Sequence, residues 1–166
     1  NPNNPTGTWV THDSLIDFLD SIPKHVLVVL DEAYFEYVEE ENYPDGIQLL
    51  SHYPGLIVTR TFSKIHGLAG LRVGYSVSSS KISEILNRVR QPFNVNVLGN
   101  VAALAALEDE EFVVESRTLN REQMNRICED LERLGLNWIP SVGNFLSVDT
   151  GRPAAPVFQR MLQSGV

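Results

Sequence analysis

The chain has 166 residues, of which 43% are hydrophobic and 20% are charged, and it carries a formal net charge of -8. This apolar fraction excludes intrinsic disorder and supplies a core for one domain or for parts of two. The acidic balance without a basic stripe argues against a nucleic-acid partner, and no apolar run is long enough to cross a bilayer, which argues against a membrane partner.

The first fifty residues predict a turn, a helix and a buried strand. Residues 1–7, NPNNPTG, are dense in the Asn, Pro and Gly of turns. Thr11 is typical of a helix N-cap, and the HDSLIDFLDSI that follows has apolar residues at helical spacing until Pro23. The run VLVVL at 26–30 predicts a strand buried on both faces, as in a parallel sheet. Residues 38–50 predict an acidic loop with one helical turn near its end.

Two further strands and a helix follow in the middle of the chain. The segment GLIVTRTFSK at 55–64 predicts a second buried strand, and GLRVGYSVSS at 70–79 predicts a shorter third one. Ser80 is a candidate N-cap for a helix through Arg90, and Pro92 then breaks that helix. Strands that alternate with helices in this way indicate an α/β sheet.

The last part of the chain predicts a different organisation. After a helix rich in Ala and Leu, a long amphipathic helix spans 110–134, with Gly135 as its C′ residue. Short strands are expected within 137–150 and a final helix within 153–165. The long helix is a plausible bridge into a second domain, with the boundary between residues 108 and 125.

Polar side chains follow the predicted strands. In open α/β sheets, ligands bind just outside the carboxyl ends of the strands. Asp31 follows the first strand, Ser63 and Lys64 follow the second, and Asn4 lies in a turn that could follow a further strand. A buried carboxylate needs a cationic partner, such as a protonated heterocyclic nitrogen, although an Asp that caps a turn gives the same pattern. The Tyr34 side chain can lie near Asp31 at this site only if the chain turns directly after the strand.

Lys64 is the candidate reactive group. The alternative is a solvated surface charge, which is the usual state of a lysine. A lysine desolvated at a sheet edge can attack carbonyls, and lysine with a carboxylate such as Asp31 is the pair that pyridoxal phosphate requires, one for the Schiff base and one for the pyridine nitrogen. Arg72 can hold phosphate oxygens through paired hydrogen bonds, and the hydroxyls of Ser63 and Thr61 can add donors.

Other ligand classes fit the sequence less well. The chain has no G-x-x-x-x-G-K-[ST] string, and the glycines at 67, 70 and 74 do not form G-x-G-x-x-G. Cys128 is the single cysteine, so no internal disulfide forms, and we expect it to be a small core residue in a reducing, cytoplasmic compartment. No metal site is predicted, because metal-ligand spacing is lacking among the histidines, His12, His25, His52 and His66.

Four strings, NPNNPTG, VVLDEAYFEY, RTFSK and AGLRVGY, occur in an order and at spacings that resemble fold-type I aminotransferases that use pyridoxal phosphate. Within these, DEAYFEY, RQPFNVN and VGNFLSVD are most similar to the histidinol-phosphate aminotransferase family. The resemblance covers the whole chain. It implies the C-terminal part of a large, three-layer α/β/α domain with a mostly parallel sheet at 1–110. The first part of a small α+β domain would follow at 111–166, so we expect a fragment of a longer protein.

The resemblance also implies roles at the cofactor ring. Lys64 would be the catalytic residue, which forms the Schiff base and moves the proton between the substrate and the cofactor. Asp31 would hold the pyridine nitrogen protonated. Tyr34 and Asn4 would hydrogen-bond the phenolic oxygen of the cofactor.

Roles at the phosphate and at the substrate are implied in the same way. Ser63 and Arg72, with Thr61, would bind the phosphate of the cofactor, and Asn144 would help to orient the substrate carboxylate. His66 departs from the family pattern, and we expect it to pack or to face solvent rather than to act in catalysis.

The implied activity is the transfer of an amino group between amino acids and 2-oxo acids by a homodimer. For this family it runs from L-histidinol phosphate and 2-oxoglutarate to imidazole acetol phosphate and L-glutamate. The chain by itself should not transaminate, because the family holds the carboxylate-binding arginine and half of the phosphate cup elsewhere. The alternatives are an aromatic aminotransferase, a threonine-phosphate decarboxylase, an aminotransferase-like domain of a DNA-binding regulator, and an α/β interaction domain without cofactor.

Overall fold

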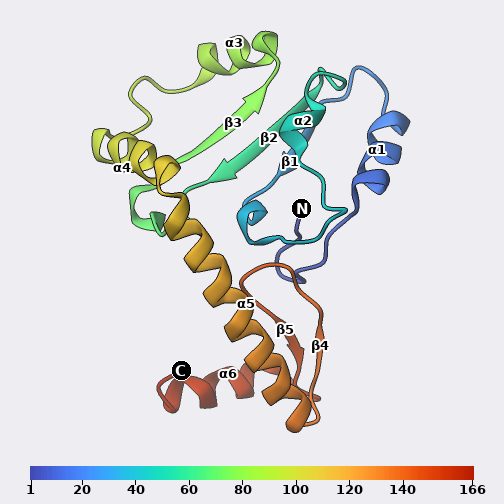
Figure 1. Cartoon of the computed structure of the whole chain (residues 1–166), viewed down its shortest axis with the longest axis vertical. Coiled ribbons are helices and arrows are strands. Elements are labelled where there is room, and N and C mark those ends of the chain that lie inside the picture. The colour runs from blue at the N-terminus through green and yellow to red at the C-terminus, as the bar shows by residue number, and fades with distance from the viewer.

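The computed structural model describes residues 1–166, which form two parts joined by a long helix (Figure 1). The first part contains a three-stranded sheet and the second a two-stranded sheet. The fold is therefore mixed α/β, which confirms the class that the sequence pattern predicts. The strands are β1 (Val28–Asp31), β2 (Leu56–Thr61), β3 (Gly74–Ser78), β4 (Asn137–Ile139) and β5 (Ser147–Asp149).

The larger sheet has the strand order β1-β2-β3. β1 and β2 are parallel, with Asp31 opposite Thr59, whereas β3 runs antiparallel to β2, with Gly74 opposite Thr61. The sheet is thus only partly parallel, because the chain turns back after β2 and pairs beside it. This topology places the ends of β1 and β2 and the start of β3 at one edge. A Cβ atom at Gly74 would lie 2.9 Å from the carbonyl oxygen of Arg60, so this close approach requires glycine.

Two helices cover one face of this sheet (Figure 1). α1 (His12–Ser21) begins after Thr11, whose hydroxyl accepts a hydrogen bond from the Ser14 backbone N–H as predicted. α2 (Gly46–Leu49) is the single helical turn expected in the acidic loop, and Asp45 is its N-cap. Each buried aliphatic side chain contributes about 1.5–3 kcal/mol. The core between these helices and the sheet consists of Leu15, Leu19, Leu30, Leu49, Leu56 and Val58.

Helix α3 (Ser80–Val89) contacts β3 and lies close to its predicted position. Its N-cap is Ser79 rather than Ser80, so the predicted start is displaced by one residue. The Ser79 hydroxyl donates a hydrogen bond to the carbonyl oxygen of Pro54 at 3.2 Å and makes none to the first turn of the helix. The helix ends three residues before Pro92, in agreement with the predicted break.

Helix α4 (Val97–Glu108) packs near the end of β2. Its N-cap is Asn96, whose side-chain oxygen accepts a hydrogen bond from the Gly99 backbone N–H at 2.7 Å. On the inner side of the helix, Ala103 is buried in a second, smaller core cluster with Phe62 and Val73. This cluster anchors the segment between β2 and β3.

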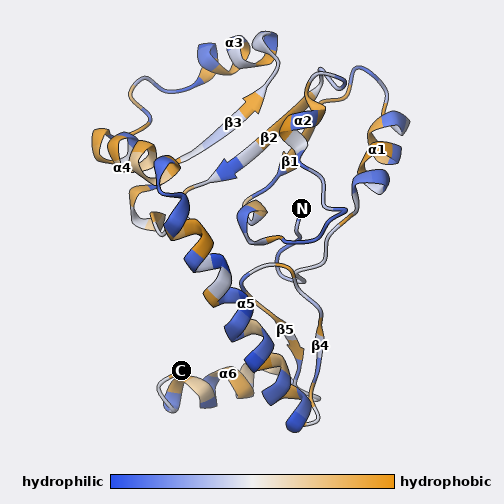
Figure 2. Cartoon of the chain, viewed as in Figure 1, coloured by the Kyte–Doolittle hydropathy of each residue, from blue (hydrophilic) through white to orange (hydrophobic).

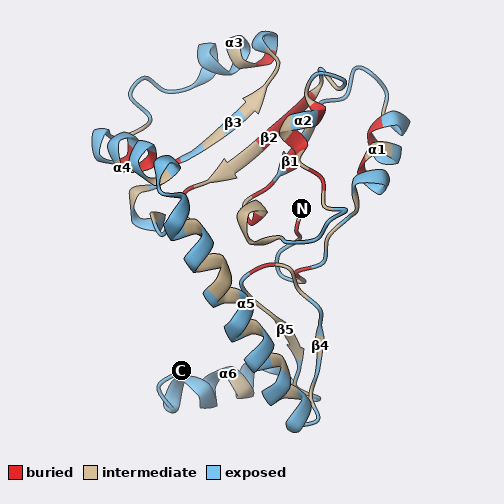
Figure 3. Cartoon of the chain, in the orientation of Figure 1, coloured by how far each residue is buried: buried red, intermediate tan, exposed pale blue.

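Helix α5 (Glu110–Arg133) connects the two parts, and α6 (Ala154–Gln163) follows β5 at the far end (Figure 1). Gly135 has φ +65° and ends α5 as predicted. No residue of α5 is buried (Figure 3), so the prediction that Cys128 is a core residue is wrong. Leu134 is 71% exposed, and Cys128 is half-buried at the surface rather than in a core.

Large apolar side chains are also exposed in the first part. Figure 2 shows the hydropathy of each element, including the hydrophobic residues along α4. The prediction that 26–30 is buried on both faces is wrong, because only Leu30 is buried there and Val29 is 60% exposed. No element of this chain covers the second face of β1. β2 fits its prediction better, since residues 56–58 are all buried. Exposed apolar side chains on α4 are Val97, Leu98, Val101, Leu104 and Leu107.

No helix in the structure combines the length and the apolar character that crossing a membrane requires.

Candidate active site

Asp31 ends β1 and turns the chain at the edge of the sheet. Its Oδ1 atom accepts a hydrogen bond from the backbone N–H of Ala33 at 3.0 Å, which forms an Asx turn. The Asp31 side chain is exposed, so the carboxylate keeps acceptor capacity for a ligand. The turn-capping role and the ligand-binding role are therefore compatible. The same turn brings Tyr34 back to the edge, which is the condition that the sequence set for Tyr34 to join Asp31.

Tyr34 is the point at which four segments of the chain meet. Its side chain is buried, with 6% exposed, and its hydroxyl oxygen lies 2.7 Å from the donating side-chain nitrogen of Asn4. The Nζ atom of Lys64 lies 5.0 Å from the centroid of the Tyr34 ring, within the range of a cation–π contact. Phe145, from the second part of the molecule, meets the same ring edge-on at 5.1 Å. Asn4, Tyr34 and Lys64 are therefore neighbours in the structure.

Lys64 lies in the turn that follows β2. Phe62 and Ile65 on either side of it are each 3% exposed, so they anchor the turn while the Lys64 side chain points outward. Lys64 is exposed in this chain, and the expectation of a desolvated lysine is wrong for these 166 residues. The physical reason is that no segment of the chain covers this side of the turn.

Ser63 and Arg72 approach each other across the segment between β2 and β3. The Nη1 atom of Arg72 donates hydrogen bonds to Ser63 Oγ at 3.4 Å and to the carbonyl oxygen of Ala69 at 2.9 Å. Thr61 Oγ1 accepts a hydrogen bond from the Ser63 backbone N–H at 3.1 Å and so shapes the turn. Arg72 has φ +57° and ψ +48°, a left-handed conformation that costs a non-glycine residue about 1–2 kcal/mol. Strain of this kind is typical of functional sites.

These side chains surround a cavity of about 620 Å³ at the sheet edge. A second cavity of about 460 Å³ lies under the N-terminal turn, and Asp31 and Ala33 line both. Asn4 and Tyr34 belong to the second cavity, so the two together hold seven of the predicted site residues. The larger cavity is lined by Asp31, Ala33, Thr59, Arg60, Thr61, Ser63, Lys64, Arg72, Gly74, Tyr75 and Ser76.

Asn144 is the one predicted site residue that the structure does not bring into this group. It lies in the loop between β4 and β5, and its side chain is exposed without a hydrogen bond to the other site residues. Its neighbours hold the loop near the site, because Phe145 contacts Tyr34 and the Gly143 carbonyl accepts a hydrogen bond from Asn120 of α5 at 3.2 Å.

This arrangement of amine, carboxylate, guanidinium and hydroxyl groups is matched by a known family over the whole chain. The sequence profile of aminotransferase class I and II matches residues 1–166. The chain belongs to the class I and II aminotransferase family. The resemblance found in the sequence motifs and the α/β fold expected from it are therefore confirmed.

Relatives within the aminotransferase family include a curated protein and solved structures. Histidinol-phosphate aminotransferase 2 of Pseudomonas fluorescens (strain Pf0-1) is 58% identical over the whole chain, which covers 45% of that protein. A structure of histidinol-phosphate aminotransferase from Sinorhizobium meliloti in complex with pyridoxal-5'-phosphate is 36% identical, with a TM-score of 0.86, over 93% of this chain and 42% of that one. L-threonine-O-3-phosphate decarboxylase from Porphyromonas gingivalis is 26% identical, with a TM-score of 0.71, over 86% of this chain and 43% of that one.

The aminotransferase chain thus spans about 45% of the length of the curated relatives that it matches. It corresponds to part of a family member, as the motif spacing predicted.

Beside the candidate site lies a charged cluster that was not predicted from the sequence. Glu32 is 1% exposed, and its Oε2 atom accepts a hydrogen bond from Arg60 Nε at 2.9 Å. The Nη2 atom of Arg60 also lies 2.7 Å from Asp45 Oδ1. Burial raises the pKa of Glu32. For Arg60, burial acts to lower the pKa, but the hydrogen bond to Glu32 and the charges of Glu32, Tyr75 and Asp45 together raise it. An arginine inside a run of buried strand residues was the available signal, because such a charge requires a partner.

His66 packs inside the same segment, which agrees with one of the two roles expected for it. Its side chain is 8% exposed and lies against the Phe62 ring with centroids 5.2 Å apart. Its Nε2 atom is 3.8 Å from Glu36 Oε1, and its buried Nδ1 atom has no hydrogen-bond partner. Burial lowers the pKa of His66, so the neutral imidazole is favoured in the folded chain.

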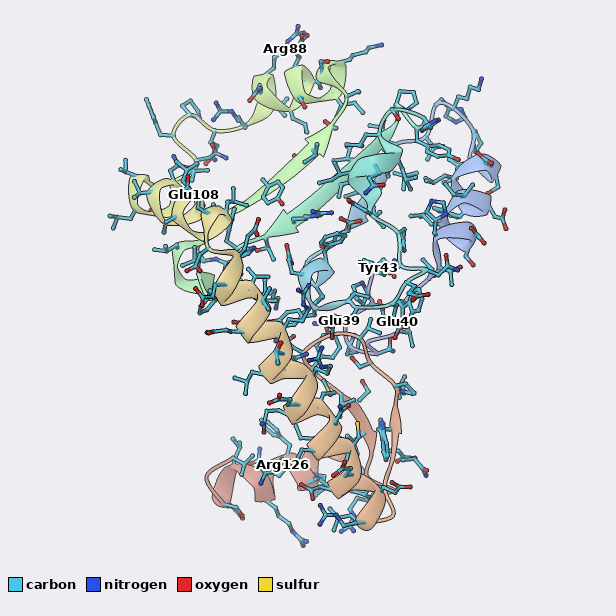
Figure 4. The ribbon with its side chains drawn as sticks, in the orientation of Figure 1. Glu39, Glu40, Tyr43, Arg88, Glu108 and Arg126 are labelled. Carbon is cyan, nitrogen blue, oxygen red and sulfur yellow. The ribbon has the colours of Figure 1, made fainter.

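The second part of the aminotransferase chain is fastened to the first beside the site. Glu39 lies in the loop alongside α5 (Figure 4). Its carboxylate accepts hydrogen bonds from Arg121 at 2.8 and 2.9 Å. The backbone N–H of Val142 donates to the carbonyl oxygen of Gly7, 3.1 Å away, which links the loop of Phe145 to the N-terminal turn. The position of Phe145 on Tyr34 therefore depends on contacts with two separate segments.

Proposed function

We propose that this chain carries the cofactor-facing part of the active site of a pyridoxal-phosphate-dependent aminotransferase. The observation that carries the proposal is that Lys64, Asp31 and Arg72 line one cavity at the edge of the sheet. The proposed reaction is amino transfer between L-histidinol phosphate plus 2-oxoglutarate and imidazole acetol phosphate plus L-glutamate. The 58% identity to a histidinol-phosphate aminotransferase supports this substrate.

The chemistry of the donor set fits pyridoxal phosphate. When bound, this cofactor supplies an aldehyde that condenses with amines and a pyridinium ring that withdraws electrons from the substrate α-carbon. Such a molecule requires an amine, a carboxylate for the ring nitrogen and cationic and hydroxyl donors for the phosphate. Lys64, Asp31 and the Arg72–Ser63 pair supply these groups at one cavity.

Lys64 has two tasks in this proposal. Its amine holds the cofactor in the resting enzyme, and it later moves a proton to and from the substrate α-carbon as a general base and acid. Tyr34 lies beneath it at 5.0 Å and limits where the Nζ atom can move. The Asn4 amide donates to the Tyr34 hydroxyl and so orients that hydroxyl toward the phenolic oxygen of the cofactor.

Asp31, Ser63 and Arg72 hold and polarise the cofactor. Asp31 keeps the ring nitrogen protonated by offering a charge-assisted acceptor. Arg72 and Ser63 donate to the phosphate, and their existing contact at 3.4 Å means that both can reach one phosphate oxygen group. The Thr61 hydroxyl holds Ser63 in place by accepting a hydrogen bond from the Ser63 backbone N–H. Asn144 would take the substrate carboxylate, with its loop held near Tyr34 by Phe145.

Threonine-phosphate decarboxylation is the second candidate, because a decarboxylase with that activity shares the fold at a TM-score of 0.71. The higher identity to the histidinol-phosphate aminotransferases favours amino transfer. Both substrates are amines that carry a phosphate, so phosphate recognition alone does not separate them.

The assembly follows from the same proposal. A helix that is apolar all round is normally buried, and α4 exposes most of its large side chains, which supports a homodimer. The domain boundary is proposed at the start of α5, with 1–110 in a large domain and 111–166 in a small one. A cytoplasmic location follows from the phosphorylated, anionic substrates, which do not cross membranes unaided.

Borohydride trapping of the full-length protein tests the proposed function. Reduction should attach pyridoxal phosphate covalently to Lys64, and Lys64→Ala should abolish both the adduct and amino transfer. An unchanged adduct in Lys64→Ala would contradict the role of Lys64. A panel of L-histidinol phosphate, phenylalanine, tyrosine and threonine phosphate then identifies the substrate, and release of CO₂ would indicate the decarboxylase. The 166-residue chain alone should show no turnover.

A further inference from the structure

The charged side chains of Glu32, Arg60 and Asp45 cluster on the α2 side of the sheet, where Glu32 is buried and Arg60 and Asp45 are 11% and 31% exposed. Successive side chains of a strand point to opposite faces. Thr59 and Thr61 line the cavity, whereas a Cβ atom at Gly46 would meet Glu32 Oε1 at 2.8 Å on the α2 side of the sheet. The cluster therefore supports, from the α2 side of the sheet, the cavity that Arg60 also lines.

The Arg60 guanidinium connects the segments that carry the site. Its Nε and Nη2 atoms bond Glu32, which directly follows Asp31 and whose other oxygen accepts from the Gly46 backbone N–H at 2.8 Å. The guanidinium carbon lies 3.5 Å from the centroid of the Phe35 ring, and Phe35 directly follows Tyr34. Arg60 itself precedes Lys64 by four residues. One side chain thus fixes the backbone on both sides of the cavity.

Stability alone does not require these charges at this position. Burying ions costs several kcal/mol each, and replacement of a buried ion pair by neutral groups is often neutral or stabilising. An apolar pair does not impose a fixed orientation on its neighbours. The planar guanidinium does, because its N–H donors point in fixed directions toward their partners. Resting on the proposed function above, we propose that Arg60, clamped by Glu32 and Asp45, is a positioning residue that sets Asp31 and Tyr34 relative to Lys64.

Substitutions in the full-length protein separate positioning from stability. Arg60→Met should lower the Tm of the apoprotein, because Glu32 loses its partner. Adding Glu32→Gln removes the unpaired charge, keeps an acceptor for Gly46, and should restore most of the Tm. In both variants the Kd for pyridoxal 5'-phosphate should still rise at least tenfold, and the pH midpoint of its visible absorbance should shift. Arg133→Met, which removes an exposed ion pair with Asp130, is the matched control. It should leave the Tm, the Kd and the pH midpoint unchanged.

The outcomes distinguish the possibilities. A double variant that recovers both the Tm and the wild-type Kd would show a stabilising cluster only and overturn the proposal. A higher Kd with an unchanged midpoint would indicate direct ligand contact by Arg60, which also overturns it. If both Met variants are insoluble, Arg60→Lys is measured in their place. A wild-type Kd and pH midpoint in Arg60→Lys would show that the guanidinium is not needed for positioning and would overturn the proposal. A wild-type protein without a Lys64-dependent band contradicts the proposed function itself and this inference with it.

Discussion

The side-chain nitrogen of Asn4 lies 2.7 Å from the hydroxyl oxygen of Tyr34, and this bond joins the N-terminal turn to the segment that follows β1. Because the Tyr34 side chain is 6% exposed, water cannot readily replace the amide. The bond therefore fixes the hydroxyl that faces the proposed cofactor.

Asn4→Ala should weaken cofactor binding by this loss of orientation. A buried hydroxyl left without its partner costs about 1–3 kcal/mol, so we expect the Kd for pyridoxal 5'-phosphate to rise roughly tenfold. Tyr34→Phe should give a similar loss, and the double variant should lose little more than either single one. Equilibrium titration of the cofactor absorbance measures all three. Additive losses would contradict a shared role, and Asn87→Ala on α3 is the control.

Arg72→Gly should separate backbone strain from ligand binding. Glycine adopts the left-handed conformation at this position without cost, so the Tm of the apoprotein should stay the same or rise. Loss of charge-assisted bonds, each worth about 1.5–3 kcal/mol, should raise the Kd for the cofactor at least tenfold. Calorimetry and titration of the same sample provide both values. Unchanged cofactor affinity would exclude Arg72 from the phosphate site.

His66 should make the stability of the protein depend on pH. Burial lowers the pKa of His66 from 6.5, so in the window below that value the unfolded chain binds the proton more readily than the folded one. Its contribution to stability is present above pH 6.5 and is lost as the pH falls toward the lower, folded pKa. His66→Phe should therefore flatten the fall in Tm between about pH 7 and pH 5. The opposite slope would mean that Glu36, at 3.8 Å, stabilises the imidazolium instead.

Leu56→Ala should test the core beneath the site. Leu56 is 1% exposed, and removal of a buried leucine side chain costs about 2–5 kcal/mol of the free energy of unfolding. Denaturant titration of the full-length protein measures the loss. Val89→Ala, at a position that is 75% exposed in this chain, serves as the comparison and should cost far less. Equal losses would indicate that α3 is covered in the full-length protein.

The sequence predicted the elements well where local chemistry decides them. Thr11, Pro23 and Gly135 mark helix ends that tertiary packing does not alter. Burial was predicted less well. The run VLVVL has the composition of a strand covered on both faces, yet Val29 is 60% exposed because no element of these 166 residues packs on that face.

The part of the candidate site that lies at the carboxyl ends of strands could be predicted from the sequence. Asp31 and Lys64 could be paired because parallel strands end at one edge. The Arg60 cluster was not found, since its partners Glu32 and Asp45 lie far apart in sequence and their pairing depends on how α2 packs. Asn144 was suggested by a motif alone, and its orientation depends on a loop whose contacts the sequence does not specify.

The single continuous helix α5 connects the distal sheet to the first part of the molecule without a break. Its 24 residues span about 36 Å, and only Asp109 separates it from the end of α4. A rotation of about 5° at that end displaces the far sheet by about 3 Å over such a length. Phe145 precedes β5 by two residues and rests on Tyr34, so a displacement of the distal sheet would be transmitted to the Tyr34 ring.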